Sequence, residues 1–272
     1  MIGCIILQSR AEQSRAEQSR AEQSRAEQSR AEQSRAEQSR AEQSSFWRKI
    51  RQLKKLCLYA FSVPKSLYFC CHYFPLKVAA TLPVLVCFRT RISEMHGEVI
   101  LPEHAKTGTV RIGFGGVGIF DEKRSRTMWQ VNGTVVFKGR AAIGHGSRIS
   151  VNRGATLEFG DHFCITAESH IVSSKGIRFG DDVLMSWQCL VMDTDFHKIW
   201  SGGTRVNENK EIVIGNHVWI GCRNTILKGV HIGDGCVIGA GSNVVKSIDA
   251  TNAVVGGNPA HVLKQDIRWS EK

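Results

Sequence analysis

The stretch that decides the fold is residues 214–250, which read IGNHVW IGCRNT ILKGVH IGDGCV IGAGSN VVKSID A. An aliphatic residue returns at every sixth position, and glycine follows it in four of the six hexads. Neither an amphipathic helix nor an alternating strand has a period of six. A triangular coil does, because each turn holds three short parallel strands that each point one aliphatic side chain inward, with glycine permitting the tight corners. The stretch therefore predicts stacked coils whose unpaired edges lie only at the two ends.

The same six-residue spacing continues upstream, less regularly. The predicted inward positions there form three sets: Phe137, Ile143 and Ile149; Phe159, Ile165 and Ile171; and Phe179, Met185 and Val191. We therefore predict a mainly β fold, with the coil over residues 108–264, a helical flanking segment at 46–107 and a C-terminal tail at 265–272.

The N-terminal 45 residues are a low-complexity appendage in which residues 9–43 are seven copies of SRAEQ. This tract is too poor in apolar residues to bury a core, so we expect it to be solvated. The codons AGC AGA GCA GAG CAG would spell three copies of AGCAG. Gain or loss of one such unit shifts the reading frame, so our hypothesis is a phase-variable on/off switch, which the gene sequence can refute.

The positive charge is concentrated after this repeat. The chain has a formal net charge of +11, and residues 44–110 hold ten Lys/Arg against three Asp/Glu. Residues 46–57, FWRKIRQLKKLC, place Phe46, Ile50, Leu53 and Cys57 on one helical face with five Lys/Arg elsewhere. Such a helix either lies on an anionic membrane or packs on its own domain. Prolines and lysines interrupt the apolar residues 56–88, which argues against a spanning helix of about 20 apolar residues.

Cysteine usage points to a reducing compartment. The nine cysteines form no CxxC pair and no Cys/His zinc spacing, so we expect reduced, buried thiols in a cytoplasmic protein. The apolar start MIGCIIL is short and lacks a basic beginning, so we expect no signal peptide. The basic helix adds the hypothesis of peripheral contact with the inner face of a bacterial plasma membrane.

The repeat resembles the left-handed parallel β-helix of the hexapeptide-repeat acyltransferases, which include O-acetyltransferases of capsule and lipopolysaccharide. This resemblance covers residues 108–264. It implies a homotrimer, with acetyl-CoA bound as co-substrate in a groove between neighbouring subunits and with no metal.

The regular spacing breaks once, between Val191 and Ile214, where the loop begins MDTDFHKIW. Acetyl transfer to a hydroxyl needs a general base, and histidine titrates near working pH. The resemblance implies that His197 in this loop is that base, while the residues alone allow a surface histidine. Asp195 or Asp193 either orients its imidazole or solvates a turn.

The resemblance also implies the remaining site residues. Trp219 would line the acceptor site as an aromatic wall, whereas the nearby His217 is expected to be an exposed structural histidine. Six residues map onto cofactor contacts: Gly221, Cys222, Ala240, Val245, Lys246 and Lys264. Cys222 and Val245 stand where relatives commonly carry hydroxyl side chains. Because of this departure, two alternatives stay open for the thioester oxyanion: the Cys222 side chain assists, or only its backbone N–H does.

The leading prediction is an acetyl-CoA-dependent O-acetyltransferase acting on a sugar hydroxyl of capsule or lipopolysaccharide, by direct transfer. The alternatives are an acetyltransferase for serine, a simple sugar or an antibiotic, and a non-catalytic β-helix that binds a membrane or polyanion. A zinc-dependent carbonic anhydrase would need three converging histidines, and His197 has no partner at close spacing. Nucleic acid is not expected as a partner, because residues 111–272 carry only a thin excess of positive charge.

Overall fold

The computed structural model describes residues 46–122 and 124–271. The chain divides into two compact units, Met1–Cys57 and Leu58–Lys272. In the first unit, residues 46–57 are helical, as predicted, and the SRAEQ tract lies outside the described residues. Among the described helices, none combines the length and the apolar character needed to cross a bilayer.

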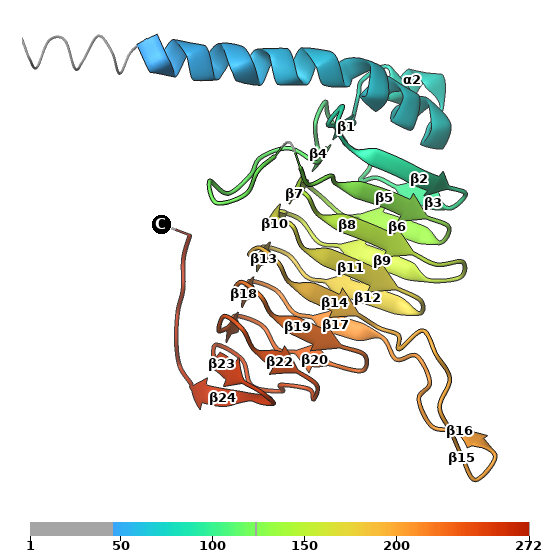
Figure 1. The fold of residues 1–272 in the computed structure, drawn as a ribbon, viewed down its shortest axis with the longest axis vertical. Coiled ribbons are helices and arrows are strands. Elements are labelled where there is room, and N and C mark those ends of the chain that lie inside the picture. Colours follow the sequence, from blue (N-terminus) through green and yellow to red (C-terminus); the bar gives the residue numbers. More distant parts are fainter. Residues whose placement is uncertain (1–45, 123, 272) are drawn as a thin grey trace, which may run out of the picture. The chain divides into compact units, whose positions relative to one another are not determined.

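The second unit contains three parallel sheets that wind around one core (Figure 1). The first sheet holds β1 (Val84–Val86), β4 (Val110–Ile112), β7 (Ala141–His145), β10 (Phe163–Ala167), β13 (Leu184–Met185), β18 (Trp219–Ile220), β21 (Val237–Ile238) and β23 (Val254–Gly257). The second holds β2 (Arg91–Met95), β5 (Met128–Val131), β8 (Arg148–Val151), β11 (His170–Ser173), β14 (Leu190–Met192), β19 (Thr225–Leu227) and β22 (Asn243–Val244). The third holds β3 (Glu98–Ile100), β6 (Thr134–Phe137), β9 (Thr156–Phe159), β12 (Gly176–Phe179), β17 (Ile212–Ile214) and β20 (His231–Ile232).

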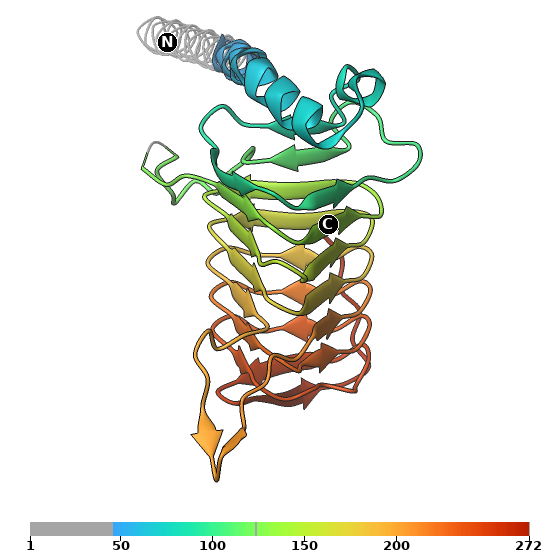
Figure 2. The ribbon, with the colours of Figure 1, turned by 90° about the vertical axis from the view of Figure 1, so that its right-hand side faces the viewer.

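Up to β14, successive strands visit the first, second and third sheets in turn, and neighbours in a sheet are three strands apart in sequence. This order makes a parallel β-helix and confirms the predicted fold class (Figure 2). Two short antiparallel pairs depart from it. One is β24 (Ala260–Lys264) on β23, and the other is the hairpin of β15 (Trp200–Ser201) and β16 (Thr204–Arg205).

The stack begins earlier than residue 108. Strands β1, β2 and β3 form a complete first turn, so residues 84–100 belong to the coil and not to a helical flank. The connections 101–109 and 113–127 lengthen the first two turns. The six-residue spacing is therefore lost in the sequence at that end, although the strands still stack.

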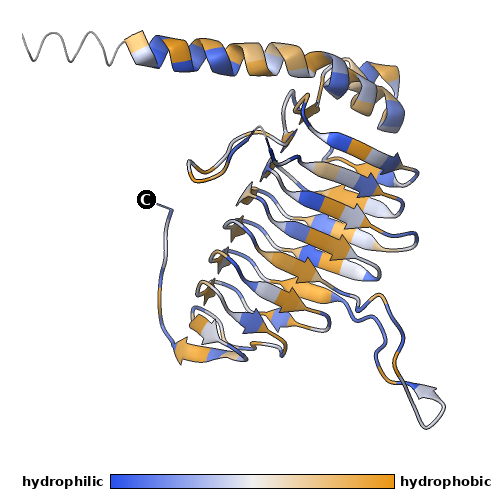
Figure 3. Cartoon of the chain, viewed as in Figure 1, coloured by the Kyte–Doolittle hydropathy of each residue, from blue (hydrophilic) through white to orange (hydrophobic). Residues whose placement is uncertain are grey.

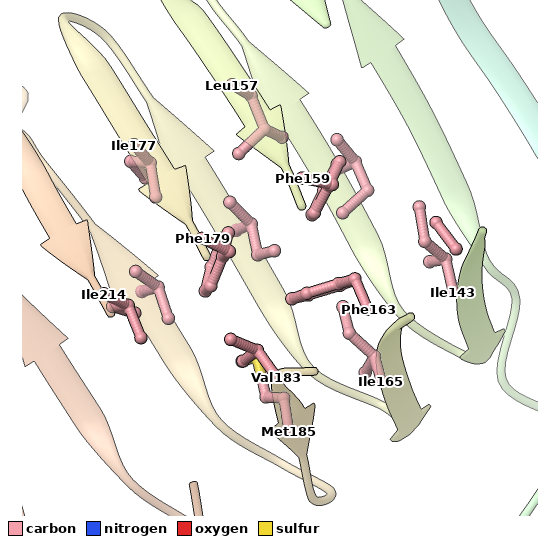
Figure 4. Packing of buried hydrophobic residues seen from close by; sticks show 14 of the residues in the cluster. Ile143, Leu157, Phe159, Phe163, Ile165, Ile177, Phe179, Val183, Met185 and Ile214 are labelled. Atoms are coloured by element: carbon pink, nitrogen blue, oxygen red, sulfur yellow. The ribbon is translucent and has the colours of Figure 1, made fainter. Parts of the chain in front are cut away.

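The core is built from the aliphatic and aromatic positions of the repeat. All nine upstream residues predicted to point inward are buried, as are the aliphatic residues that open the hexads from Ile214 to Val244. The rings of Phe137 and Phe159 stack with centroids 5.2 Å apart, and those of Phe159 and Phe179 are 5.6 Å apart. Figure 4 shows Phe163 beside this column, and Figure 3 shows apolar and polar residues side by side on the strands. Stacked rings in register tie each turn to the next.

The corner between the third and first sheets carries a ladder of side-chain oxygens. The Asp181 carboxylate accepts the N–H of Asp161 at 2.7 Å, and Asn216 Oδ1 accepts the N–H of Asp181 at 2.9 Å. Asp234 accepts the N–H of Asn216 at 2.7 Å in the same way. Short polar residues recur after the glycines because each satisfies a backbone donor of the turn before it.

A helix over residues 58–73 and the short α2 (Leu76–Ala79) cover the N-terminal end of the stack. Phe69 and Cys70 are fully buried, and the Phe69 ring lies 5.4 Å from that of Trp129 on β5. Ser66 Oγ accepts the N–H of Val86 at 2.8 Å. One face of this helix is therefore an integral part of the β-helix unit.

Candidate active site

A loop of residues 193–211 leaves the stack at the corner between the second and third sheets and carries the β15–β16 hairpin outward (Figures 1 and 2). Asn207 anchors its base, because its amide nitrogen donates to Asp195 Oδ2 at 2.9 Å and to the carbonyl of His197 at 2.8 Å. Lys228, just after β19, donates to the Asp195 carboxylate and to the carbonyl of Asn207. The loop is thus tied to the next turn of the stack.

His197 lies on the exposed part of this loop. Its backbone is held, with its N–H donating to the carbonyl of Asp195 at 2.6 Å. Among the described residues, none hydrogen-bonds the imidazole. Asp195 faces Lys228 and Asn207 instead, and these two hydrogen bonds hold the pKa of its carboxyl below the usual range. The structure therefore shows Asp195 as an anchor of the loop, where the sequence had suggested an imidazole partner.

Asp193, the other candidate for orienting His197, is fully buried. Its carboxylate accepts hydrogen bonds from Ser173 Oγ and from the N–H groups of Ser174, Lys175 and Gly176, at 2.6 to 3.0 Å. All four of these hydrogen bonds hold a corner of the preceding turn. Asp193 is a structural residue.

Trp219 points outward from β18 on the first sheet, as its place in the hexad predicts, and is 38% exposed. Its Nε1 donates to Ser186 Oγ at 3.3 Å. The Trp269 ring lies 6.0 Å from Trp219 and stacks on His217 at 4.3 Å. Trp269 Nε1 also donates to the carbonyl of His217 at 2.9 Å. Sequence reasoning missed Trp269, whose only signal was an aromatic residue in a polar tail.

Three of the predicted cofactor residues gather at the corner between the first and second sheets. Gly221 and Cys222 follow β18, and Ala240 follows the neighbouring β21. A Cβ on Gly221 would come within 2.7 Å of the carbonyl oxygen of Ile238, so the close stacking of turns requires glycine there. Within the described chain, the N–H of Cys222 makes no hydrogen bond.

The other three lie elsewhere. Val245 and Lys246 follow β22 as Lys228 follows β19, so they lie at the corner that carries the His197 loop. Lys264 ends β24, opposite Val254. Figure 1 shows the hairpin loop and the first-sheet strands at opposite edges of the stack. Within one chain, His197 is therefore separated from Trp219 and from the Gly221 corner.

Thiol chemistry and metal binding find little support at these corners. All described cysteines are free, and burial raises the pKa of Cys189 to about 11. Among residues 46–122 and 124–271, no three His, Cys, Asp or Glu side chains are grouped as metal ligands.

The family model for the bacterial transferase hexapeptide (six repeats) matches residues 211–246. The repeat of this chain is therefore similar to that of the bacterial hexapeptide transferases. A putative lipopolysaccharide biosynthesis O-acetyl transferase, WbbJ, of Escherichia coli (strain K12) is 28% identical to the chain over 144 residues, which are 49% of this chain and 73% of the relative. The polysialic acid O-acetyltransferase of Neisseria meningitidis is 39% identical over 104 residues, which are 37% of this chain and 48% of the relative.

The polySia specific acetyltransferase NeuO is a solved structure similar to this chain. It is 22% identical, covers 70% of this chain and 79% of its own, and has a TM-score of 0.45. The chain spans between about half and three quarters of the length of the two curated relatives. The family model and these two relatives confirm the resemblance drawn from the repeat.

Proposed function

We propose that this protein moves an acetyl group from acetyl-CoA to a hydroxyl on a cell-surface polysaccharide, of the capsule or lipopolysaccharide type. The observation that carries the proposal is the position of His197. It lies on a loop extruded from an otherwise regular stack, with an exposed imidazole that no described side chain engages. The O-acetyltransferase names of the relatives support the acceptor class.

In the proposed reaction, the imidazole of His197 takes the proton of the acceptor hydroxyl. The hydroxyl oxygen attacks the thioester carbonyl, the C–S bond breaks, and the thiolate of CoA leaves. The unused N–H of Cys222 is a candidate donor to the oxyanion formed on the way. The thiol of Cys222 needs no covalent role. Asp195 acts through the loop anchor, because its contacts are with Lys228 and Asn207.

We further propose that the working unit is a homotrimer with acetyl-CoA between neighbouring subunits. The separation of His197 from Trp219 and the Gly221 corner supports this. One chain would supply the base, and its neighbour would supply the aromatic wall and the corner of small residues. Lys246 and Lys264 are exposed and would pair with phosphates of the cofactor.

The test is transfer of labelled acetyl from acetyl-CoA to the surface polysaccharide of the producing cell. His197→Ala is compared with His231→Ala, which removes an exposed histidine from β20. General-base catalysis is worth about 10² to 10⁴ in rate, so the first variant should lose that factor while the second keeps its activity. Label that persists with His197→Ala overturns the role of His197. CoA binding without any label points to a smaller acceptor, such as serine, a simple sugar or an antibiotic.

We place the reaction in the cytoplasm, where acetyl-CoA is available. The proposal includes phase variation through the SRAEQ tract. An uninterrupted AGCAG repeat in the gene would support it, and mixed synonymous codons would refute it.

A further inference from the structure

The helix at the N-terminal end of the stack exposes several large apolar side chains. Its serines, Ser62 and Ser66, are buried against the stack together with Phe69, whereas other large apolar residues face outward. Phe61 is 70% exposed and Tyr68 is 61% exposed, while Leu76 of α2 is 77% exposed. We call this surface the outer cap face. It consists of Ala60, Phe61, Val63, Pro64, Leu67, Tyr68, Leu76 and Val78.

Nothing in the fold of the second unit requires this arrangement. The stack is already closed by Phe69 and Cys70 from the other side of the same helix. A group of exposed apolar side chains on one element marks a site of interaction with another body, because it leaves apolar area in contact with water. The members of the outer cap face are uncharged, and two lysines adjoin them in sequence, Lys65 after Pro64 and Lys77 between Leu76 and Val78.

A basic hollow borders this face. It has a volume of 630 Å³ and shares Tyr68 with the outer cap face. Its charged residues are Lys65, Arg89, Arg91, Arg126 and one carboxylate, Glu122. Glu122 pairs with Arg89 at 3.8 Å, so among the described residues Arg91 and Arg126 make no ion pair.

Two further contacts join the hollow to the apolar face. The rings of Phe61 and Phe88 are 6.3 Å apart, and Phe88 lines the hollow. The ammonium of Lys65 is anchored by the carbonyls of Phe88 and Thr90, at 2.6 and 2.7 Å. Aromatic rings and guanidinium groups therefore lie side by side at the rim.

The surrounding sequence has a one-sided charge. Residues 44–93 contain nine Lys/Arg and no Asp or Glu. This pattern suits an anionic partner. A second copy of the chain fits less well, because a twofold contact would bring the same face of each copy together, and with it Arg91 and Arg126 of both. An anionic lipid surface accepts both the apolar residues and the cations.

We propose that the outer cap face docks on an anionic phospholipid bilayer, with lipid phosphate groups received by Arg91 and Arg126 in the basic hollow. The apolar side chains enter the boundary between headgroups and acyl chains, as those of interfacial helices do. This function goes beyond the proposed acetyl transfer and does not depend on it.

The experiment is sedimentation of the full-length protein with vesicles of phosphatidylglycerol and phosphatidylethanolamine, and with vesicles of phosphatidylcholine alone. Binding should need phosphatidylglycerol and weaken as salt is raised. Arg91→Gln with Arg126→Gln should weaken partition about 30-fold, since each cation near an anionic surface is worth ~1 kcal/mol. Phe61→Gln with Leu76→Gln should weaken it at least tenfold, by roughly one apolar side chain's burial.

The matched control is Ile100→Gln with Leu263→Gln, which removes two exposed apolar side chains from β3 and β24 of the same unit. It should sediment like the wild type. Absence of sedimentation with phosphatidylglycerol vesicles overturns the proposal, and so does an equal loss in the control. A wild-type assembly that breaks up with Phe61→Gln and Leu76→Gln, without vesicle binding, assigns the face to a contact between copies. Acetyl transfer to a soluble acceptor is measured on every variant, so failure of docking and failure of the transferase proposal are distinguishable.

Discussion

Two inactive variants should regain activity when they are combined in one trimer, if the site is shared between subunits. His197→Ala removes the base, and Ala240→Trp fills the corner proposed for the cofactor. Ala240 is exposed at its corner, so the larger side chain extends outward and leaves the buried stack unchanged. Each variant alone should be folded and inactive.

The expected recovery follows from the separation of the two corners. In a trimer that holds both variants, one of the three interfaces joins an intact His197 to an intact Ala240 corner. Trimers purified through a different tag on each variant should therefore show about a third of the wild-type rate. The assay measures labelled acetyl transfer per trimer. The baseline is the rate of trimers built from one variant alone and purified through the same two tags.

The result that would refute this reasoning is activity no higher than that baseline in trimers shown to contain both chains. His197 and Ala240 would then act within one chain, and the loop would have to fold back to the first sheet. A rate near that of the wild type would equally contradict a single restored interface.

Three further predictions concern stability and pH. Phe159→Ala should lower the free energy of unfolding by about 3–5 kcal/mol, because the ring is fully buried between Phe137 and Phe179. Phe61→Ala, at an exposed position, should change it little, and urea unfolding measures both. Asp193→Ala should cost at least about 3 kcal/mol in the same assay, because it leaves four hydrogen-bond donors without their acceptor. The depressed pKa of Asp195 means that its anchor to Lys228 is present above the usual carboxyl pKa and is lost as pH falls through the lower, folded value. Lys228→Met should therefore raise the pKa of Asp195, seen by NMR titration, and an unchanged pKa would contradict the assigned cause.

Much of the stack is readable from the sequence because its period is set by the backbone. With three strands per turn, every sixth residue must point inward, and Phe159, Ile220 and Val244 are all buried as that rule requires. The rule failed at residues 84–100, where long connections hide the spacing. The break at 193–211 also identified the loop of His197, since a regular coil needs no such insertion.

Partners that are distant in sequence could not be read in this way. Asp195 meets Lys228, 33 residues on, and His217 meets Trp269, 52 residues on. No local pattern encodes these pairs, because they depend on how a loop and a tail fold back against the stack. The same holds for the helix of residues 58–73, whose alternation of serine and apolar residues leaves open which face is buried.

The sequence by itself determined the coil from residue 137 onward, its inward residues and the loop at 193–211, because a six-residue period buries aliphatic side chains in a coil of short strands. Only the tertiary structure decided which corner each candidate residue occupies and which face of the capping helix meets water. Those outcomes depend on connection lengths and on contacts across the stack, where residues far apart in the chain compete for the same partners. The separation of His197 from Trp219 is such an outcome, since His197 lies at the corner between the second and third sheets and Trp219 lies on the first sheet.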